Sequence, residues 1–158
     1  MNVTHHSIVD GGSLQIQGII IKTGCNVSIG AIYCRRTPST NEISRINEVF
    51  GSCDILMGDF NLSHRIDNHQ KKLDKLCNNV KESLLKEITR SISNNQLDYV
   101  LVNTVLKEYC YSTSFYNFIS DHKAIVLRMG LDNNKISKST REKLYFDKES
   151  HLKAKLQN

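Results

Sequence analysis

Hydrophobic and polar positions along the first part of the chain predict a pair of β-strands. In residues 13–22, S-L-Q-I-Q-G-I-I-I-K, apolar positions alternate with glutamine before the segment becomes fully apolar, a pattern typical of a strand. Residues 23–26 predict a turn, and residues 27–34, V-S-I-G-A-I-Y-C, predict a second strand that ends before Pro38. We therefore expect a hairpin over this region.

Two later segments have the spacing of amphipathic helices. Ser39 and Glu42 fit a capping box, in which each side chain bonds the other residue's backbone, and they predict a helix over about 41–50. A second helix is predicted from residue 73 to about residue 86, because apolar residues recur there at helical spacing: Leu73, Leu76, Cys77, Val80, Leu84 and Ile88.

Short apolar runs predict the remaining strands. Residues 53–60 are apolar enough for a central strand that is buried on both faces. Three further strands are predicted over 97–102, 111–115 and 124–129. The order β, β, α, β, α, β, β, β indicates an α/β fold with a mixed sheet. No clear apolar period follows Gly130, so we expect a domain over residues 1–130.

Composition and charge narrow the class of protein. The 158 residues carry 21 basic and 16 acidic side chains, a net charge of +5, which permits a polyanionic partner without requiring one. Seven lysines and arginines against three acidic residues fall within residues 135–158, so residues 131–158 are expected to form a basic, solvated tail. Five cysteines without a C-x-x-C pair disfavour a zinc site or a disulfide framework.

The sequence also contains no membrane span or secretion signal. No apolar run approaches the roughly 18 residues that a transmembrane helix needs, so no membrane partner is expected. The first residues lack the basic and apolar stretches of a secretory signal, which predicts an intracellular protein, with the nucleus as one option.

Polar clusters occur where strands are predicted to end. Asp59 and Asn61 lie two positions apart, so they share one side of the strand and could hold a hard cation or a phosphate-bound water. The alternative is a polar turn in which Asp59 only caps the strand. Asp98 opens an apolar strand, where it either completes the preceding turn or orients a histidine.

Ser120-Asp121-His122 directly precedes the predicted strand 124–129. His122 is the only one of the six histidines at a strand start beside an acid, although Ser120 and Asp121 could equally form a simple turn. Tyr33 ends a predicted strand, where it either packs half-buried or contacts a phosphate. Arg35 and Arg36, which follow shortly after it, either contact a phosphate or are surface charges.

Taken in order, these clusters resemble the endonuclease/exonuclease/phosphatase superfamily. The resemblance rests on Tyr33, G-D-F-N at 58–61, L-D-Y-V-L-V at 97–102 and S-D-H at 120–122, and it covers about residues 14–128. The phrase F-I-S-D-H-K-A-I and the pair Thr89-Arg90 are similar to retroelement and Helitron-type endonuclease domains. The resemblance implies a deoxyribonuclease I-like sandwich of two sheets.

The same resemblance implies a role for each site residue. Asp59 would position the attacking water and bind metal, Asn61 would hold the scissile phosphate, and Tyr33 would contact it. His122 would stabilise charge on the phosphate or act as the base, with Asp98 orienting it and Asp121 at or near the metal. The implied reaction is phosphodiester hydrolysis of nucleic acid, DNA in particular, assisted by Mg²⁺ or Mn²⁺.

One departure from the family pattern changes the expectation. The family places an Asn and a metal-binding Glu before the hairpin, and the thirteen residues that precede it here contain only Asp10 as an acid. We therefore expect the C-terminal portion of an endonuclease domain, with the N-terminal half missing and activity impaired. The alternatives are a catalytically dead remnant and a half-domain that depends on a partner, such as a missing half or a fused helicase or reverse transcriptase. Either would at most bind nucleic acid.

Overall fold

The computed structural model describes residues 2–10, 13–23, 27–85, 88–90, 94–116 and 120–130. Six strands form one sheet in the order β1-β2-β3-β4-β6-β5: β1 (Asn2–Asp10), β2 (Ser13–Lys22), β3 (Ser28–Cys34), β4 (Ile55–Asp59), β6 (Asp98–Asn103) and β5 (Lys81–Ser83). A second sheet consists of β7 (Cys110–Phe115) and β8 (Ala124–Met129). The helices are α1 (Thr40–Phe50), α2 (Asp67–Cys77) and the short 3₁₀ helix η1 (Thr104–Tyr109).

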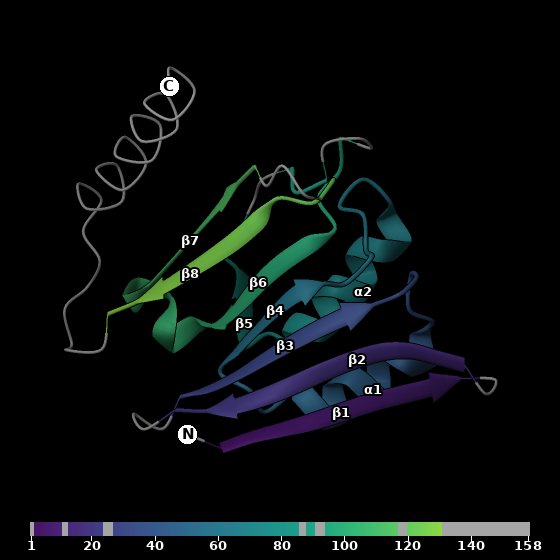
Figure 1. Ribbon diagram of the computed structural model, residues 1–158, viewed down its shortest axis with the longest axis horizontal. Helices are drawn as coiled ribbons and strands as arrows, with labels where there is room; N and C mark the ends of the chain where they lie inside the picture. Colours follow the sequence, from purple (N-terminus) through teal and green to yellow (C-terminus); the bar gives the residue numbers. More distant parts are fainter. Residues whose placement is uncertain are drawn as a thin grey trace.

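The large sheet carries a separate apolar core on each face. Helices α1 and α2 cover one face, where Phe50 and Leu76 pack against Leu56 of β4. Strands β7 and β8 cover part of the other face, where Leu127 packs near Val100 of β6 (Figure 1). The predicted α/β sandwich of two sheets is thus confirmed.

The predicted capping box begins α1. The Glu42 backbone N–H donates to the Ser39 hydroxyl at 3.3 Å, and the Glu42 carboxylate accepts from the Ser39 backbone N–H at 2.7 Å. The carboxylate also pairs with Arg36 at 3.0 Å. Arg36 is therefore held by the helix start, while its neighbour Arg35 is left to line the cavity described below.

The predicted second helix is wrong beyond Cys77. Helix α2 ends there because Asn78 and Asn79 adopt left-handed backbone conformations, which asparagine tolerates better than most residues. The chain then turns into β5, and Leu84 joins the core under β7 and β8 rather than the core of Leu73. The apolar residues read as one helical stripe serve opposite faces of the sheet, and one helix cannot reach both.

The N-terminal segment, over which the sequence pattern predicts no strand, forms β1. It pairs with β2 over its whole length, and the His6 ring contacts the Phe50 ring edge-on at a centroid distance of 5.5 Å. Its sequence, N-V-T-H-H-S-I-V-D, has no strict apolar alternation, and residues 2–5 and 7 are exposed. The strand is fixed by pairing with β2 rather than by a pattern of its own.

Some predicted features lie outside the described residues, namely residues 24–26 of the first turn, Cys25 and the basic tail 131–158. The cysteines that are described, Cys34, Cys53, Cys77 and Cys110, are free thiols. Burial raises the pKa of the Cys34 thiol to about 12, which keeps it protonated at neutral pH. In the described part of the chain, no helix is long and apolar enough to cross a membrane.

Candidate active site

Strand pairing brings three of the predicted site residues into one row. Tyr33 lies opposite Asp59 across the parallel β3–β4 pair, and Asp59 lies opposite Asp98 across the antiparallel β4–β6 pair. Residues directly opposite each other point to the same face of a sheet. The two carboxylates and the tyrosine therefore share the face that β7 and β8 partly cover.

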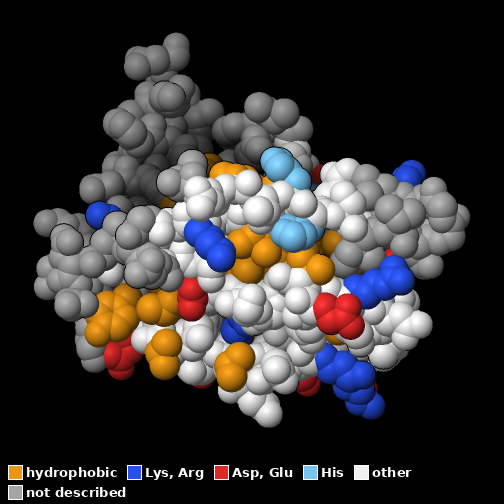
Figure 2. All heavy atoms as spheres, turned by 90° about the horizontal axis from the view of Figure 1, so that it is seen from below, with side chains coloured by type: hydrophobic (Ala, Val, Ile, Leu, Met, Phe, Trp, Pro, Cys, Tyr) orange, Lys and Arg blue, Asp and Glu red, His pale blue; other side chains and the backbone are white. Residues whose placement is uncertain are grey.

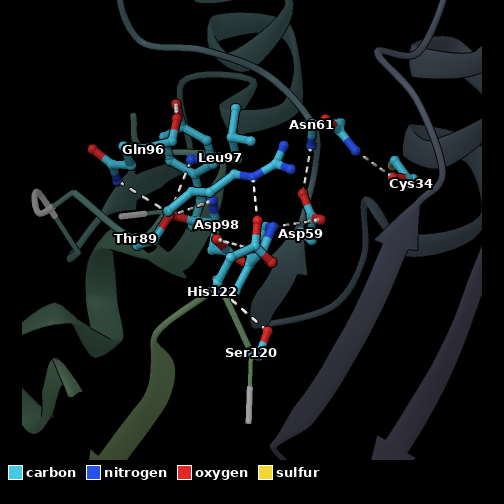
Figure 3. A network of polar contacts seen from close by, with 12 residues as sticks. Cys34, Asp59, Asn61, Thr89, Gln96, Leu97, Asp98, Ser120 and His122 are labelled. Atoms are coloured by element: carbon cyan, nitrogen blue, oxygen red, sulfur yellow. Dashed lines mark hydrogen bonds and ion pairs between the residues drawn. The ribbon is translucent and has the colours of Figure 1, made fainter. Parts of the chain in front are cut away.

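The end of β4 is built around a glycine and an asparagine. Gly58 has a φ of +138°, and a Cβ there would lie 1.9 Å from the Ile32 carbonyl oxygen, so a side chain cannot be accommodated. Asn61 has a φ of 50°, and its backbone N–H donates to Asp59 Oδ1 at 2.9 Å. The Asn61 side-chain amide donates to the Cys34 carbonyl at 2.9 Å, which fixes the amide beside Asp59 (Figure 3).

His122 lies between the two carboxylates. Its Nδ1 atom is 2.9 Å from Asp98 Oδ2, and its Nε2 atom is 3.9 Å from Asp59 Oδ2. Because a carboxylate only accepts hydrogen bonds, Nδ1 carries the proton and Nε2 faces Asp59 (Figure 3). The predicted pairing of Asp98 with a histidine is thus present, and the reading of Asp98 as only the end of a turn is not needed.

Thr89 stabilises the positions of Asp98 and His122 through hydrogen bonds to the backbone. Its hydroxyl accepts the backbone N–H groups of Leu97 and Asp98 at 3.1 Å each, and its carbonyl accepts the Lys123 N–H at 2.7 Å. The segment containing Thr89 therefore ties the start of β6 to the loop that carries His122. In the sequence, Thr89-Arg90 is only a point of resemblance to retroelement endonucleases, and the pattern predicts no structural role for either residue.

Arg90 is the functional candidate that sequence reasoning missed. It forms an isolated β-bridge with His122, and its Nε atom donates to Asp121 Oδ2 at 2.7 Å. This hydrogen bond lowers the pKa of the Asp121 carboxyl below its usual value. Asp121 therefore reaches the site as the partner of an arginine, an arrangement that no local sequence pattern reveals.

The predicted site residues and Arg90 line one open cavity of about 520 Å³. Its walls are Tyr33, Arg35, Asp59, Asn61, Arg90, Asp98, Ser120, Asp121 and His122. The structure therefore brings together all six residues predicted from the sequence. Tyr33 is 51% exposed, so part of its surface is accessible from this cavity.

Asp59 has the most unusual electrostatic setting of the cluster. Burial raises the pKa of its carboxyl, and the nearby Asp98 carboxylate acts in the same direction. The hydrogen bond from the Asn61 backbone N–H opposes that pKa rise, and so do the electrostatic effects of His122 and Arg90. A titratable group in a cleft whose pKa is shifted by burial and by a specific neighbour is a typical candidate for chemistry.

The cluster also fits a divalent cation. Asp59, Asp98 and His122 each place one potential ligand atom within 4.8 Å of the others. His122 engages Asp98 Oδ2 and the Asn61 backbone N–H engages Asp59 Oδ1, whereas Asp59 Oδ2 lies 3.9 Å from His122 Nε2 and could hold a hard cation. Among the described residues lining the cavity there are three aspartates and no glutamate, so the glutamate that the resemblance implies is not in this wall.

Comparisons with known proteins agree with the fold. The Endonuclease-reverse transcriptase family matches residues 27–126. The solved endonuclease domain of TRAS1, a telomere-specific non-LTR retrotransposon, aligns with a TM-score of 0.59 at 14% identity over 83% of this chain and 80% of that one. The Haemophilus ducreyi cytolethal distending toxin aligns at 0.51 and 17% identity over 80% of this chain, and SmcL at 0.50 and 14% over 81%. No curated protein matches.

The fold and the site define a deoxyribonuclease I-like domain of the endonuclease/exonuclease/phosphatase superfamily. Within it, the chain belongs to the Endonuclease-reverse transcriptase family, whose match includes Tyr33, Asp59, Asn61, Asp98 and His122. The chain spans 57% of the toxin structure and 65% of SmcL. The likeness to these structures, all below 20% identity, describes the fold and not their activities.

Proposed function

We propose that this chain is a metal-dependent endonuclease domain of the transposon type that hydrolyses phosphodiester bonds in DNA. The observation that carries the proposal is the hydrogen-bonded series Asp98–His122 with Asp59 beside it, in a cavity that also presents two arginines. Carboxylates and an imidazole supply proton transfer, and guanidinium groups bind phosphate oxygens. The family match supports this class of reaction.

Each residue is given a role by its position. Asp98 keeps His122 protonated at Nδ1, so that Nε2 is directed into the cavity to receive or donate a proton near the phosphate. Asp59 accepts a hydrogen bond from the attacking water, and Asn61 offers the remaining N–H of its amide to the scissile phosphate. Tyr33 and Arg35 contact the phosphate from the rim.

Mg²⁺ or Mn²⁺ is the proposed cofactor. Asp59 would hold it, and Asp121 would bind it directly or lie close to it. A bound divalent cation would neutralise charge that develops on the phosphate and polarise the leaving oxygen. With few charged ligands in the described wall of the cavity, its affinity should be low, because affinity follows ligand charge and number.

Nicking of a supercoiled plasmid by the purified chain tests the proposal. We expect open-circle product with Mg²⁺ or Mn²⁺ at millimolar concentration, none with EDTA, and about a 10²-fold lower rate in Asn61→Ala. His64→Ala is the matched control in the same loop region, since His64 is exposed and lines a different cavity. Cleavage that persists in EDTA would contradict the metal requirement.

A second candidate is a half-domain that binds nucleic acid and cleaves it only with a partner. It is favoured by the composition of the cavity wall, in which the described residues include no glutamate. Under this candidate the folded chain binds DNA and leaves the plasmid intact. Adding a segment that supplies a carboxylate to the cavity would then restore nicking.

Asp121→Asn separates the two contacts proposed for Asp121. If Asp121 serves the metal, the Mg²⁺ concentration for half-maximal cleavage should rise by about tenfold or more. Arg90→Gln is the matched change, which leaves the carboxylate in place and should raise the KM for DNA with the metal requirement unchanged. An Asp121→Asn variant that shows only a higher KM would mean that Asp121 acts solely by positioning Arg90.

A further inference from the structure

The row of site residues continues across the sheet beyond Tyr33. Tyr33 lies opposite Gln17 of β2, and Gln17 lies opposite Ser7 of β1. Together with the pairs Tyr33–Asp59 and Asp59–Asp98, the register forms one cross-strand row of five polar residues from β1 to β6. Because directly opposed residues point to one face, this polar row leads from the catalytic cluster to the edge of the sheet.

A second cavity lies over the outer half of this row. It has a volume of about 460 Å³ and is lined by His5, His6, Ser7, Gln17, Gly18, Ile19, Ala31, Ile32 and Tyr33. We name it the β1–β3 groove. Tyr33 lines both this groove and the catalytic cavity, so the two adjoin at this residue. Ser7 and Gln17 are exposed, as Tyr33 is.

The floor of the groove is supported from the helix side. Gly18 is the reason, because a Cβ at that position would lie 2.4 Å from Phe50 Cζ. Phe50 of α1 therefore packs directly against the backbone of β2, and the His6 ring lies against Phe50 on the same side. Seen from the β1 edge, histidine and apolar side chains lie next to one another (Figure 2). The groove is thus formed by paired strands rather than by a loop.

We propose that the β1–β3 groove binds the nucleotides next to the scissile phosphate of a DNA strand, with Gln17 as the residue that holds a base edge. This inference rests on the proposed function and names the substrate contacts of the same site. Continuity through Tyr33 identifies the occupant, since a strand with its phosphate at Asp59 and His122 can extend past Tyr33 directly into the groove.

The chemistry of the groove matches bases rather than phosphates. An exposed tyrosine ring offers a stacking surface for a base of any sequence. The Gln17 amide presents one acceptor and two donors, which can pair with the edge of a base, as glutamine does with adenine. No lysine or arginine is among the described residues that line the groove, so its contribution to affinity should depend little on salt.

Binding is measured separately from cleavage, in EDTA, with a fluorescein-labelled single-stranded DNA oligonucleotide and fluorescence anisotropy. We expect Gln17→Ala to weaken binding about fivefold and Tyr33→Ala about tenfold. Gln17→Glu keeps the size of the side chain and adds a negative charge, so it should weaken binding more than Gln17→Ala. Gln70→Ala is the matched control, because Gln70 is an exposed glutamine on α2, behind the opposite face of the sheet.

Equal affinities for the wild type, Gln17→Ala and Gln17→Glu, within twofold, would overturn the assignment of the groove. A wild-type chain that shows no measurable binding would also overturn it. Failure of the proposed function would give a different result. Metal-dependent nicking would be absent, but DNA affinity would still decrease in the order Gln70→Ala, Gln17→Ala, Gln17→Glu.

Discussion

Replacing His122 by alanine should lower the rate of phosphodiester cleavage by about 10²–10⁴-fold, the contribution typical of a positioned acid or base. The imidazole is the only group that contacts both carboxylates of the cluster among the described residues, with Nδ1 on Asp98 and Nε2 toward Asp59. Its removal leaves Asp98 buried without its ring partner. Single-turnover cleavage of a labelled duplex measures the chemical step directly.

Asp98→Asn extends this prediction to the partner of the ring. The asparagine amide cannot act as a purely accepting group, so the His122 tautomer that directs a free Nε2 into the cavity loses its support. The cleavage rate of Asp98→Asn should fall to a similar extent as that of His122→Ala. The double variant should cleave no more slowly than His122→Ala alone, because the two residues act as a unit. Additive losses in the double variant, or cleavage within threefold of the wild type in His122→Ala, would contradict the assigned pair.

Most of the site could be predicted from the sequence because its residues stand at strand ends. Asp59, Asp98 and His122 each mark a boundary between an apolar run and a polar segment, and such boundaries meet at one edge of a sheet. The resemblance added the pairing between them. The structure then supplied what neither could give, the register that aligns Tyr33, Asp59 and Asp98 in one row.

The place of Arg90 in the site could not be predicted from the sequence pattern. Arg90 lies in a short segment with no apolar period, which is bridged locally to Asn95, and the bridge to His122, distant in the sequence, brings it to the site. The end of α2 was missed for a related reason. Leu73 and Leu84 fit one helical stripe, but the asparagines between them turn the chain to the other face of the sheet. Periodicity within a segment carries no information about which face of a sheet the segment will cover.

Asp59→Asn should abolish metal-dependent cleavage and, in EDTA at neutral pH, make the fold more stable. Burial and the Asp98 carboxylate raise the pKa of Asp59 in the folded chain above its unfolded value. The stability linked to a raised pKa is fully present below the unfolded pKa and is lost as the pH rises through the folded pKa. At neutral pH the wild type has therefore lost that stability, whereas asparagine carries no charge and keeps Oδ1 as an acceptor for the Asn61 N–H.

Thermal unfolding as a function of pH, with and without Mg²⁺, tests this trade between stability and function. In EDTA the Tm of Asp59→Asn should exceed that of the wild type at pH 7, and the gap should close as the pH falls below the ordinary aspartate pKa. Adding Mg²⁺ should raise the Tm of the wild type and leave that of Asp59→Asn nearly unchanged, since the variant lacks the carboxylate that we propose holds the cation. An Asp59→Asn variant that is less stable than the wild type at pH 7 in EDTA would mean that the buried carboxylate holds the end of β4 together, and that its charge is a structural requirement rather than a cost retained for catalysis.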